Sequence, residues 1–320
     1  MKAATWGVGV AGVIALAAVI LPLAGEAASS PLLFALAAFR ALTLLASMIV
    51  VAAIAVLLFL VRRRKAAAIV AMMVVLLAVP FFLGLGGGTA PDVPAAGSPG
   101  ELRILSWNTD QREVDDDLMV LVEQTQPDII ALPEYFTTTA QGRLEAFAEK
   151  NDLSIYGWES SSATVLVADR LGTYRPRNDD TPLWAGISLV PDDPDSPPLV
   201  VAHLQGPMLL GGNDLWREHI EWVRSRCDAP NVIAVGDFNA TVANLGADRL
   251  GSCIDVGSTL DQRASGTWPA SLPAALGAQI DHVFAGSEWR ASWFGVLEAP
   301  RTEWAEAVDH RPIFAVLTRG

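Results

Sequence analysis

The sequence predicts an α+β domain, a sandwich of two β-sheets with helices outside, preceded by three transmembrane helices. The 320 residues are 52% hydrophobic yet carry a net charge of −13, and these two properties separate near residue 100. Residues 1–100 hold six basic and two acidic residues, whereas residues 101–320 hold 16 basic and 33 acidic ones. Both parts are rich in Val, Leu, Ile and Ala, which excludes a disordered chain, and their contrast excludes a single soluble domain.

Three apolar runs are long enough to cross a bilayer: Ala3–Ala24, Pro31–Val61 and Ala66–Leu85. About 20 apolar residues in a helix span a hydrocarbon core roughly 30 Å thick. The first run is longer than the roughly 7–15 residues of a signal-peptide core, so we interpret it as a retained anchor rather than a cleaved signal. Residues 1–87 are therefore predicted to be a membrane anchor with three transmembrane helices.

The basic residues of this anchor predict its orientation. Short loops rich in Lys and Arg stay in the cytoplasm, which places Lys2 and the cluster Arg62–Lys65 inside. Three crossings then place everything after Leu85 outside, with Arg40 snorkelling to the outer interface. We expect a multi-pass protein of the cell (inner) membrane with an extracytoplasmic domain.

Residues 88–100, rich in Gly, Pro and Ala, have the composition of a flexible linker that leads to the acidic domain, 101–320. This domain contains two cysteines, Cys227 and Cys253. An oxidising compartment permits them to form a disulfide, which would stabilise the fold by about 3 kcal/mol. Two buried thiols that never meet are the alternative.

Within residues 101–320, nine short apolar runs bounded by turn residues predict β-strands. The runs are Leu102–Trp107, Asp128–Leu132, Thr164–Ala168, Ala185–Val190, Leu199–Leu204, Val232–Val235, Ile280–Phe284, Trp293–Leu297 and Ile313–Leu317. Segments with helical patterns are Val114–Thr125, Thr138–Lys150 and Asn213–Arg226. Because strands and helices do not alternate strictly, we expect two packed sheets with helices outside.

Polar side chains recur at the ends of six of these strands, where packing alone would not place them. They are Asn108, Asp110, Glu134, His203, Asp237, Asn239, Asp281, Asp309 and His310. Taken singly, each is typical of a turn, a helix cap or an exposed carboxylate. Together they indicate a shared cleft at one edge of the sandwich.

The segments around these residues resemble motifs of the endonuclease/exonuclease/phosphatase superfamily. In order, they are Leu-Arg-Ile-Leu-Ser-Trp-Asn108, Asp-Ile-Ile-Ala-Leu-Pro-Glu134, Ala-His203-Leu, Val-Gly-Asp237-Phe-Asn239-Ala, Gln-Ile-Asp281-His-Val-Phe and Asp309-His310-Arg-Pro-Ile. The resemblance covers essentially all of 101–320 and implies a DNase-like, four-layer αββα sandwich. Thr267–Pro269 also resembles a membrane-anchored bacterial branch, and Pro133 stands where the family usually has Gln, which implies altered substrate contacts.

The resemblance implies a metal-dependent phosphoric ester hydrolase. Mg²⁺ prefers carboxylate oxygens and bound water, and Mn²⁺ is the alternative ion. Glu134 is expected to be the main ligand, with Asp309 and Asn108 completing the site directly or through water. Asp110 matches a metal-proximal Asp of some family members.

Phosphoryl transfer needs in-line attack by water while negative charge builds on the phosphate oxygens. His310 is expected to contact the phosphate or act as a base, with Asp281 accepting its other ring proton. Asp237 would orient or deprotonate the water, and Asn239 would donate a hydrogen bond to a phosphate oxygen. His203 matches a family histidine that assists the leaving group. Whether Asp237 or His310 is the base stays open.

The charge of the domain bears on its substrate. Nucleic-acid surfaces carry clustered Lys and Arg, whereas residues 101–320 have a net charge of −17 and one lysine, Lys150. Tethering to a membrane favours a phosphoester at the outer surface, such as a phospholipid, polyprenyl or inositol phosphate, with membrane lipids as partners. The sequence does not distinguish a monoester from a diester and indicates no protein partner. An extracytoplasmic nuclease and a non-catalytic membrane scaffold that keeps the fold are the alternatives.

Overall fold

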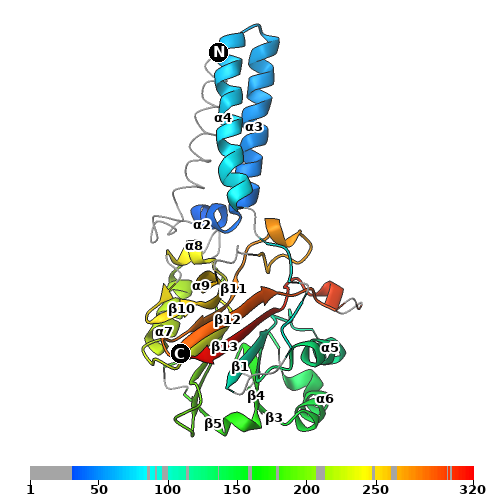
Figure 1. Ribbon diagram of the computed structural model, residues 1–320, viewed down its shortest axis with the longest axis vertical. Helices are drawn as coiled ribbons and strands as arrows, with labels where there is room; N and C mark the ends of the chain where they lie inside the picture. The colour runs from blue at the N-terminus through cyan, green and yellow to red at the C-terminus, as the bar shows by residue number, and fades with distance from the viewer. Residues whose placement is uncertain are drawn as a thin grey trace.

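The computed structural model consists of a helical hairpin that stands on one end of a two-sheet domain (Figure 1). The hairpin is formed by α3 (Arg40–Leu60) and α4 (Arg64–Gly84), and the short helix α2 (Pro31–Ala38) lies at its base. The structure describes residues 31–84, 87–90, 92–95, 100–112, 115–135, 137–157, 161–177, 180–206, 213–246, 249–260, 265–300, 302 and 305–320.

The second predicted span, Pro31–Val61, forms two helices rather than one. The backbone leaves the helical conformation at Phe39, with φ −98° and ψ 47°, and separates α2 from α3. α2 then packs on the domain, where Phe34 is buried in the apolar cluster beneath it. Arg40 follows the break directly, but an apolar segment has the same pattern whether it contacts lipid or protein, so the sequence alone does not show that α2 packs on the domain.

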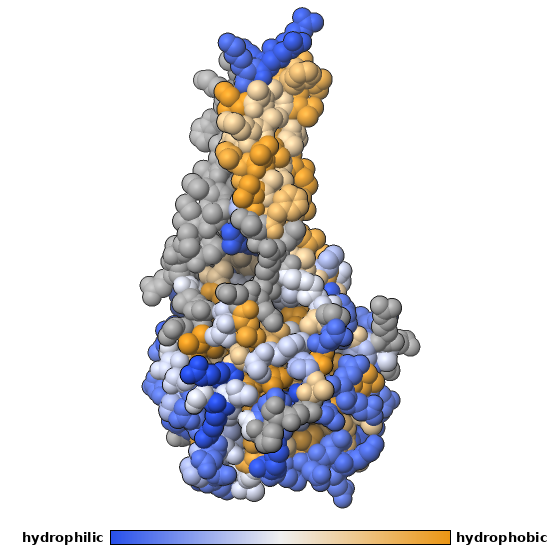
Figure 2. Space-filling model, in the orientation of Figure 1, coloured by the Kyte–Doolittle hydropathy of each residue, from blue (hydrophilic) through white to orange (hydrophobic). Residues whose placement is uncertain are grey.

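Two helices in the described part of the chain are long and apolar enough to cross a membrane, Arg40–Leu60 and Arg64–Phe82, with mean hydropathies of 2.8 and 2.3. They pack on each other through Val51, Ala55 and Val70. Figure 2 shows apolar residues along the hairpin and hydrophilic residues at its far tip. The first predicted span, Ala3–Ala24, lies outside the described residues and stays a prediction.

The domain is a sandwich of two sheets. Over the described residues, the first sheet has six strands in the order β12-β13-β1-β2-β4-β3: Trp289–Val296, Ile313–Arg319, Glu101–Ser106, Ile129–Pro133, Ala163–Ala168 and Leu153–Tyr156. The second sheet has seven strands, again counting only described residues, in the order β5-β6-β7-β8-β11-β10-β9: Tyr174–Pro176, Gly186–Pro191, Leu199–His203, Ile233–Asp237, Asp281–Ala285, Cys253–Asp255 and Arg249–Leu250.

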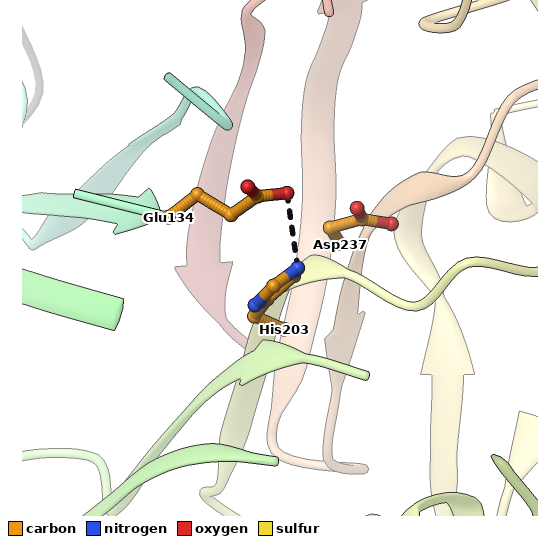
Figure 3. A group of neighbouring side chains, drawn as sticks. All are labelled: Glu134, His203 and Asp237. Atoms are coloured by element: carbon orange, nitrogen blue, oxygen red, sulfur yellow. Dashed lines mark ion pairs between the residues drawn. The ribbon is translucent and has the colours of Figure 1, made fainter. Parts of the chain in front are cut away.

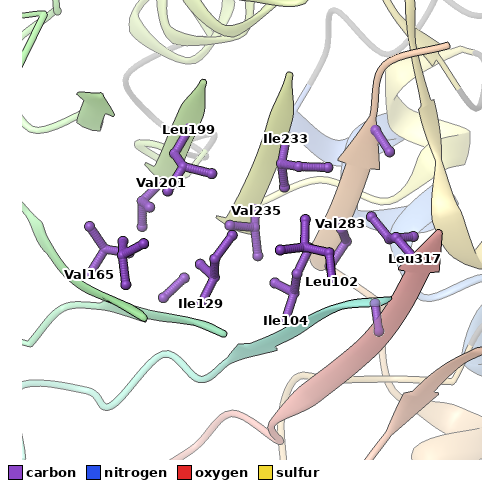
Figure 4. Close-up of a cluster of buried hydrophobic side chains, with 14 of the residues drawn as sticks. Leu102, Ile104, Ile129, Val165, Leu199, Val201, Ile233, Val235, Val283 and Leu317 are labelled. Carbon is purple, nitrogen blue, oxygen red and sulfur yellow. The ribbon is translucent and has the colours of Figure 1, made fainter. Parts of the chain in front are cut away.

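The apolar core lies between the two sheets (Figure 4). Successive side chains of a strand point to opposite faces, so Leu199 and Val201 of β7 enter this core, whereas Val200 and Ala202 face the outer helical layer. Full burial of one Val or Leu side chain is worth roughly 1.5–3 kcal/mol. The core therefore makes the sheets a rigid support for residues at their ends.

Helices cover the outer faces of both sheets. α5 (Asp115–Thr125) and α6 (Thr137–Lys150) pack on the first sheet, and α7 (Asp214–Arg226) packs on the second (Figure 1). The shorter elements are α8 (Val242–Leu245), α9 (Val256–Thr259) and the 3₁₀ helices Asp169–Leu171, Ala274–Leu276 and Ala305–Ala307. The layer order of helix, sheet, sheet and helix confirms the predicted αββα sandwich.

All nine predicted strands and all three predicted domain helices are present, with ends that shift by a few residues. The sequence missed β3, β5, β9 and β10. These strands have only two to four residues and lie at or next to a sheet edge. Such short segments carry too little periodicity to be recognised.

The segment 88–100, predicted to be a flexible linker, packs on the domain over part of its length. The Ala90 N–H donates to Val296 O at 2.7 Å, which continues the hydrogen bonding along the edge strand β12. The Thr89 hydroxyl donates to Glu298 Oε1, also at 2.7 Å. Thr89 and Ala90 are therefore bound to the domain rather than surrounded by solvent alone.

Cys227 and Cys253 form a disulfide, with their Cα atoms 5.4 Å apart. The bridge joins the C-terminal end of α7 to β10 and is fully buried. Of the two alternatives that the sequence left open, the structure has the bridged one.

Candidate active site

Strand register brings three functional side chains of the second sheet into one row. β7 and β8 pair in parallel with His203 opposite Asp237, and β8 and β11 pair antiparallel with Asp281 opposite Asp237. Gly236, just before Asp237, has φ 131°, and a Cβ there would lie 2.1 Å from Ala202 O. Glycine is therefore required for this close approach of β7 and β8.

The first sheet contributes residues at the same end of the sandwich. β1 and β2 are parallel neighbours, so Asn108 and Glu134, which follow them, lie together. β13 is antiparallel to β1, so His310, which precedes β13, lies at the same edge. The indole Nε1 of Trp107 donates to the His310 carbonyl at 3.0 Å and holds this segment in place.

Three of the nine predicted site residues have a left-handed backbone: Asp110 with φ 48°, Glu134 with φ 55° and Asn239 with φ 49°. Non-glycine residues adopt this region rarely, Asn and Asp more readily than others. Each such residue costs about 1–3 kcal/mol and persists only where the surrounding structure imposes it. Strain at the ends of three strands that meet at the site indicates that the surrounding structure fixes the backbone there and directs these side chains into the site.

The Glu134 carboxylate is held as an anion. Its Oε1 lies 3.1 Å from His203 Nε2 (Figure 3). The same oxygen accepts a hydrogen bond from Asn108 Nδ2 at 3.1 Å, and Gln111 Nε2 donates to Oε2 at 3.3 Å. The hydrogen bond to His203 outweighs burial and lowers the pKa of Glu134 to about 2. The same contact, together with the charge of Asp237, raises the pKa of His203 against the effect of its burial.

Asp237 is in the opposite situation. Burial, followed by the charge of Asp281, raises the pKa of Asp237 to about 6. Its carboxylate accepts hydrogen bonds from Asn108 Nδ2 at 3.0 Å and from the backbone and side chain of Asn239 at 2.7 and 3.2 Å. A carboxyl group with this pKa can gain or lose a proton near neutral pH.

His310 lies among three carboxylates. Its Nδ1 is 2.8 Å from Asp281 Oδ2, and its Nε2 is 3.8 Å from Asp237 Oδ2 and 3.9 Å from Asp309 Oδ1. Burial opposes the charged imidazole, but these carboxylates, Asp281 foremost, raise the pKa of His310 to about 10. Asp281 thus fixes the ring and its Nδ1 proton, which leaves Nε2 directed at the other two carboxylates.

Asp309 and Asp110 lie on the open side of the site. Asp309 is half-exposed, and its Oδ2 accepts a hydrogen bond from Trp268 Nε1 at 2.8 Å. Asp110 is paired with Arg112 at 3.3 Å, and its N–H donates to Asn108 Oδ1 at 3.0 Å. Both border a cavity of about 390 Å³ that also contacts Glu134, Asp237, Asn239 and His310.

The donor atoms of the cluster fit a hard divalent cation. Glu134, His203 and Asp237 offer ligand atoms within 4.8 Å of one another (Figure 3). Asp237, Asp281 and His310 form a second such group. Buried His203 Nδ1 and Asp281 Oδ1 have no hydrogen-bond partner among the residues that the structure describes. Oxygen-rich donor sets of this kind suit Mg²⁺ or Mn²⁺.

The nine site residues predicted from the sequence all lie at this end of the sandwich, although some contacts differ from expectation. His203 contacts Glu134, the expected metal ligand, rather than standing apart for a leaving group. Asn239 Nδ2 donates to Leu204 O at 2.8 Å in addition to Asp237. Gln111 and Trp268 also contact the site, through Glu134 and Asp309, and were not predicted from the sequence. Trp268 lies in a motif that was recognised, whereas Gln111 carries no sequence signal.

A family model described as the endonuclease/exonuclease/phosphatase family matches residues 105–303. The chain belongs to this family. The match covers the segments from β1 to the approach to β13 and confirms the family that the motifs indicated. Members of the endonuclease/exonuclease/phosphatase family hydrolyse phosphoesters, so the chain has a phosphoesterase fold.

Solved structures share this fold. The endonuclease/exonuclease/phosphatase from Bacteroides vulgatus is 15% identical and covers 69% of this chain and 100% of its own, with a TM-score of 0.52. A humanized D. rerio TDP2 is 18% identical and covers 68% of this chain and 99% of its own, with a TM-score of 0.50. No curated protein matches the sequence. At these identities the likeness is one of fold alone.

Proposed function

We propose that this family member is a metal-dependent phosphoesterase that acts at the outer face of the membrane on an envelope lipid or a small phosphate. The observation that carries the proposal is the arrangement of Glu134, Asp237 and His310 around one cavity. The first is held as an anion, the second titrates near neutral pH, and the third is held by Asp281. Two carboxylates with separated pKa values are typical of divided catalytic roles.

Glu134 would hold the cation, with Asn108, Asp110 and Asp309 completing the site directly or through water. We propose Mg²⁺, with Mn²⁺ as the alternative. When bound, the cation supplies positive charge that polarises a phosphoryl oxygen and stabilises the developing negative charge. The low pKa of Glu134 keeps this ligand deprotonated over the whole physiological range.

The chain's own residues would handle the proton and orient the phosphate. Asp237 borders the cavity, and its pKa of about 6 lets it accept and release a proton near neutral pH. His310 presents Nε2 beside it, 3.8 Å from Asp237 Oδ2. Of the two candidate bases for the attacking water, Asp237 is favoured, because the pKa of His310, raised to about 10 by its neighbouring carboxylates, keeps that imidazole protonated near neutral pH. Asn239 and His203 are close enough to this pair to donate hydrogen bonds to phosphate oxygens once a substrate displaces their present partners.

The hairpin supports a membrane location for the domain. α3 and α4 return the chain to the side from which it entered, so α2 and the domain share one side whatever precedes residue 31. The basic tip Arg62–Lys65 favours the cytoplasm, so we assign the domain to the outside. The Cys227–Cys253 bridge agrees, because disulfides persist in oxidising compartments.

The charge of the domain supports a compact phosphoester over nucleic acid. Phosphate contacts by Lys and Arg supply most of the affinity for a polynucleotide, and residues 101–320 have a net charge of −17. A membrane-anchored site also favours substrates that reside at the membrane. We also propose that the chain belongs to the membrane-anchored bacterial branch of the family, which Thr267–Pro269 resembles.

The test is a substrate panel for the purified full chain in detergent, with Mg²⁺ or with EDTA. The panel contains a chromogenic phosphodiester, a phosphomonoester, lipid phosphates and DNA. We expect Mg²⁺-dependent hydrolysis of a lipid phosphate or small phosphoester. Glu134→Ala should abolish it, whereas Glu149→Ala, at an exposed position of α6, should not.

Two outcomes would contradict the proposal in different ways. No metal-dependent turnover of any substrate would overturn the enzyme assignment and favour a non-catalytic scaffold. DNA as the only good substrate would overturn the lipid or small-phosphate assignment and favour a nuclease.

A further inference from the structure

The cavity over the catalytic cluster has two chemically different sides. Its polar side includes Glu134, Asp237 and His310. The opposite side is lined by Phe34, Ala35, Ala38 and Phe39, all from α2 and the residue that follows it. We call this second side the α2 wall. The segment 31–39 contains no charged residue, so the wall is apolar throughout.

The α2 wall is fixed to the domain rather than lying loosely beside it. The Phe34 ring is 4% exposed and packs edge-on against Trp216 of α7, with centroids 5.1 Å apart. Asn244 Nδ2, in α8, donates to the Phe34 carbonyl at 3.0 Å. An apolar contact and a buried hydrogen bond therefore hold the wall over the site.

Trp268 connects the α2 wall to the catalytic cluster. Its ring contacts Phe39, with centroids 5.7 Å apart, and its Nε1 donates to Asp309 Oδ2 at 2.8 Å. The loop that carries Trp268 is held by Arg311, whose guanidinium donates to Ala270 O at 2.7 Å. The wall and the catalytic carboxylates are thus parts of one cavity.

The α2 wall is also continuous with the candidate membrane span. α3 begins at Arg40, directly after Phe39, so the apolar side of the cavity ends where the span begins. Figure 1 shows α2 between the hairpin and the domain. A hydrocarbon chain at the membrane surface therefore needs to travel only the length of α2 to reach the cluster.

We propose that the α2 wall receives the hydrocarbon chain of a membrane lipid whose phosphoester is hydrolysed at Glu134, Asp237 and His310. The inference rests on the proposed phosphoesterase function and narrows its substrate class to lipid phosphoesters. Apolar surface facing a cavity gains free energy when an apolar group covers it, and an alkyl chain provides that cover. A small polar phosphate or a polynucleotide would leave the wall in contact with water.

The test compares two substrates that differ only in chain length. The full chain in detergent micelles, with Mg²⁺, is assayed on p-nitrophenyl hexadecyl phosphate and p-nitrophenyl methyl phosphate, and in parallel on hexadecyl and methyl phosphate to cover monoesterase activity. We expect kcat/KM to favour the long chain by at least about tenfold, which burial of roughly two methylene groups would produce.

Variants separate the wall from simple enrichment of the long ester in micelles. Ala38→Asp places a charge on the wall, and Phe39→Ala removes the wall's ring that contacts Trp268. Each should lower the long-to-short ratio of kcat/KM, Ala38→Asp by about tenfold. The control is Phe59→Ala, an exposed ring at the far end of α3, which should keep the wild-type ratio. Thermal unfolding monitors whether each variant is folded.

The outcomes distinguish this inference from the function on which it rests. Suppose that wild type, Ala38→Asp and Phe39→Ala hydrolyse both esters with the same long-to-short ratio of kcat/KM. That result would show that the α2 wall does not bind the hydrocarbon chain, and it would leave the phosphoesterase proposal intact. No Mg²⁺-dependent turnover of any ester would overturn both.

Discussion

At the residue scale, the site depends on neighbouring carboxylates whose pKa values shift in opposite directions. Glu134 is hydrogen-bonded by His203 and its pKa falls to about 2, whereas Asp237 is buried beside Asp281 and its pKa rises to about 6. The first group is suited to hold a cation at any physiological pH. The second is suited to exchange a proton near neutrality.

Glu134→Gln should weaken Mg²⁺ binding, because the amide replaces an anionic oxygen ligand with a neutral one. Loss of a residue that only hydrogen-bonds to a metal ligand commonly lowers metal affinity about 10–100-fold. Loss of a direct ligand should therefore lower it by at least about tenfold. Isothermal titration calorimetry of the EDTA-treated chain measures this. Glu149→Gln is the matched control, and equal affinities for the two variants would show that Glu134 is not a ligand.

Asp281→Asn should lower kcat with little change in KM. Asp281 fixes the Nδ1 proton of His310 at 2.8 Å, and loss of a positioned acid–base group typically costs about 10²–10⁴-fold in rate. Steady-state kinetics on the best substrate of the panel provide the measurement, with exposed Asp228→Asn as the control. A kcat equal to that of the control would show that positioning of His310 by Asp281 does not contribute to catalysis.

His282 should make stability depend on pH. Both of its ring nitrogens face acceptors, Asp255 Oδ1 at 2.9 Å and the carbonyls of Ala240 and Gln279 at 3.0 and 3.1 Å, so the doubly protonated ring fits best. Burial disfavours the charge, but Asp255 outweighs it and raises the pKa of His282 above 6.5. Burial also opposes the Asp255 anion, but His282 lowers the pKa of Asp255 below 3.8.

The sign of the effect follows from these directions. The His282 contribution is complete below pH 6.5 and is lost as pH rises through the raised pKa, and the Asp255 contribution is complete above pH 3.8 and is lost as pH falls through the lowered one. His282→Gln should therefore cost about 3 kcal/mol of unfolding free energy near pH 5.5, and less at pH 9. Chemical unfolding at the two pH values checks this, and a cost that grows with pH would contradict it.

At the element scale, periodicity and composition predicted the long strands and helices but not where α2 ends. The run 31–61 contains one charged residue, Arg40, directly after the break, but the sequence does not show that α2 packs on the domain through Phe34. The strand ends that carry the site were predictable because motif residues follow apolar runs. The partners Trp268 and Gln111 were not, because each reaches the site through contacts distant in sequence.

The disulfide should contribute to stability by linking α7 to β10. Replacing both cysteines, Cys227→Ser and Cys253→Ser together, should lower the unfolding free energy by about 3 kcal/mol because the unfolded chain regains the entropy of a closed loop. Chemical unfolding of the oxidised protein and the double variant measures the difference, and peptide mapping without reductant verifies the bond. Equal stability of the two proteins would contradict the prediction.

At the scale of the whole molecule, the hairpin and the site lie at the same end of the domain, with α2 between them (Figure 1). If the hairpin crosses a membrane as proposed, this arrangement directs the candidate catalytic cavity towards that membrane and leaves the acidic remainder of the domain exposed to solvent. The apolar excess of the sequence thus belongs to the hairpin and its negative charge to the domain. The proposed substrate would bind where these two parts meet.

A reporter fused after Gly88 should be active if it works only outside the cytoplasm. The basic tip of the hairpin favours the inside, so both ends of the hairpin should face outward. Fusion at Arg63 gives the opposite expectation and serves as the control. A cytoplasm-only reporter that is active after Gly88 would reverse the topology and remove the outer-face assignment.

The most direct test of the account is the Mg²⁺ dependence of phosphoester hydrolysis by the EDTA-treated full chain. The initial rate is measured as Mg²⁺ is added back, for wild type and Glu134→Gln. We expect no turnover without metal, a rate that saturates at the Mg²⁺ concentration where binding saturates, and a requirement for more Mg²⁺ in the variant. Hydrolysis that is independent of added metal, or identical Mg²⁺ curves for the two proteins, would contradict it.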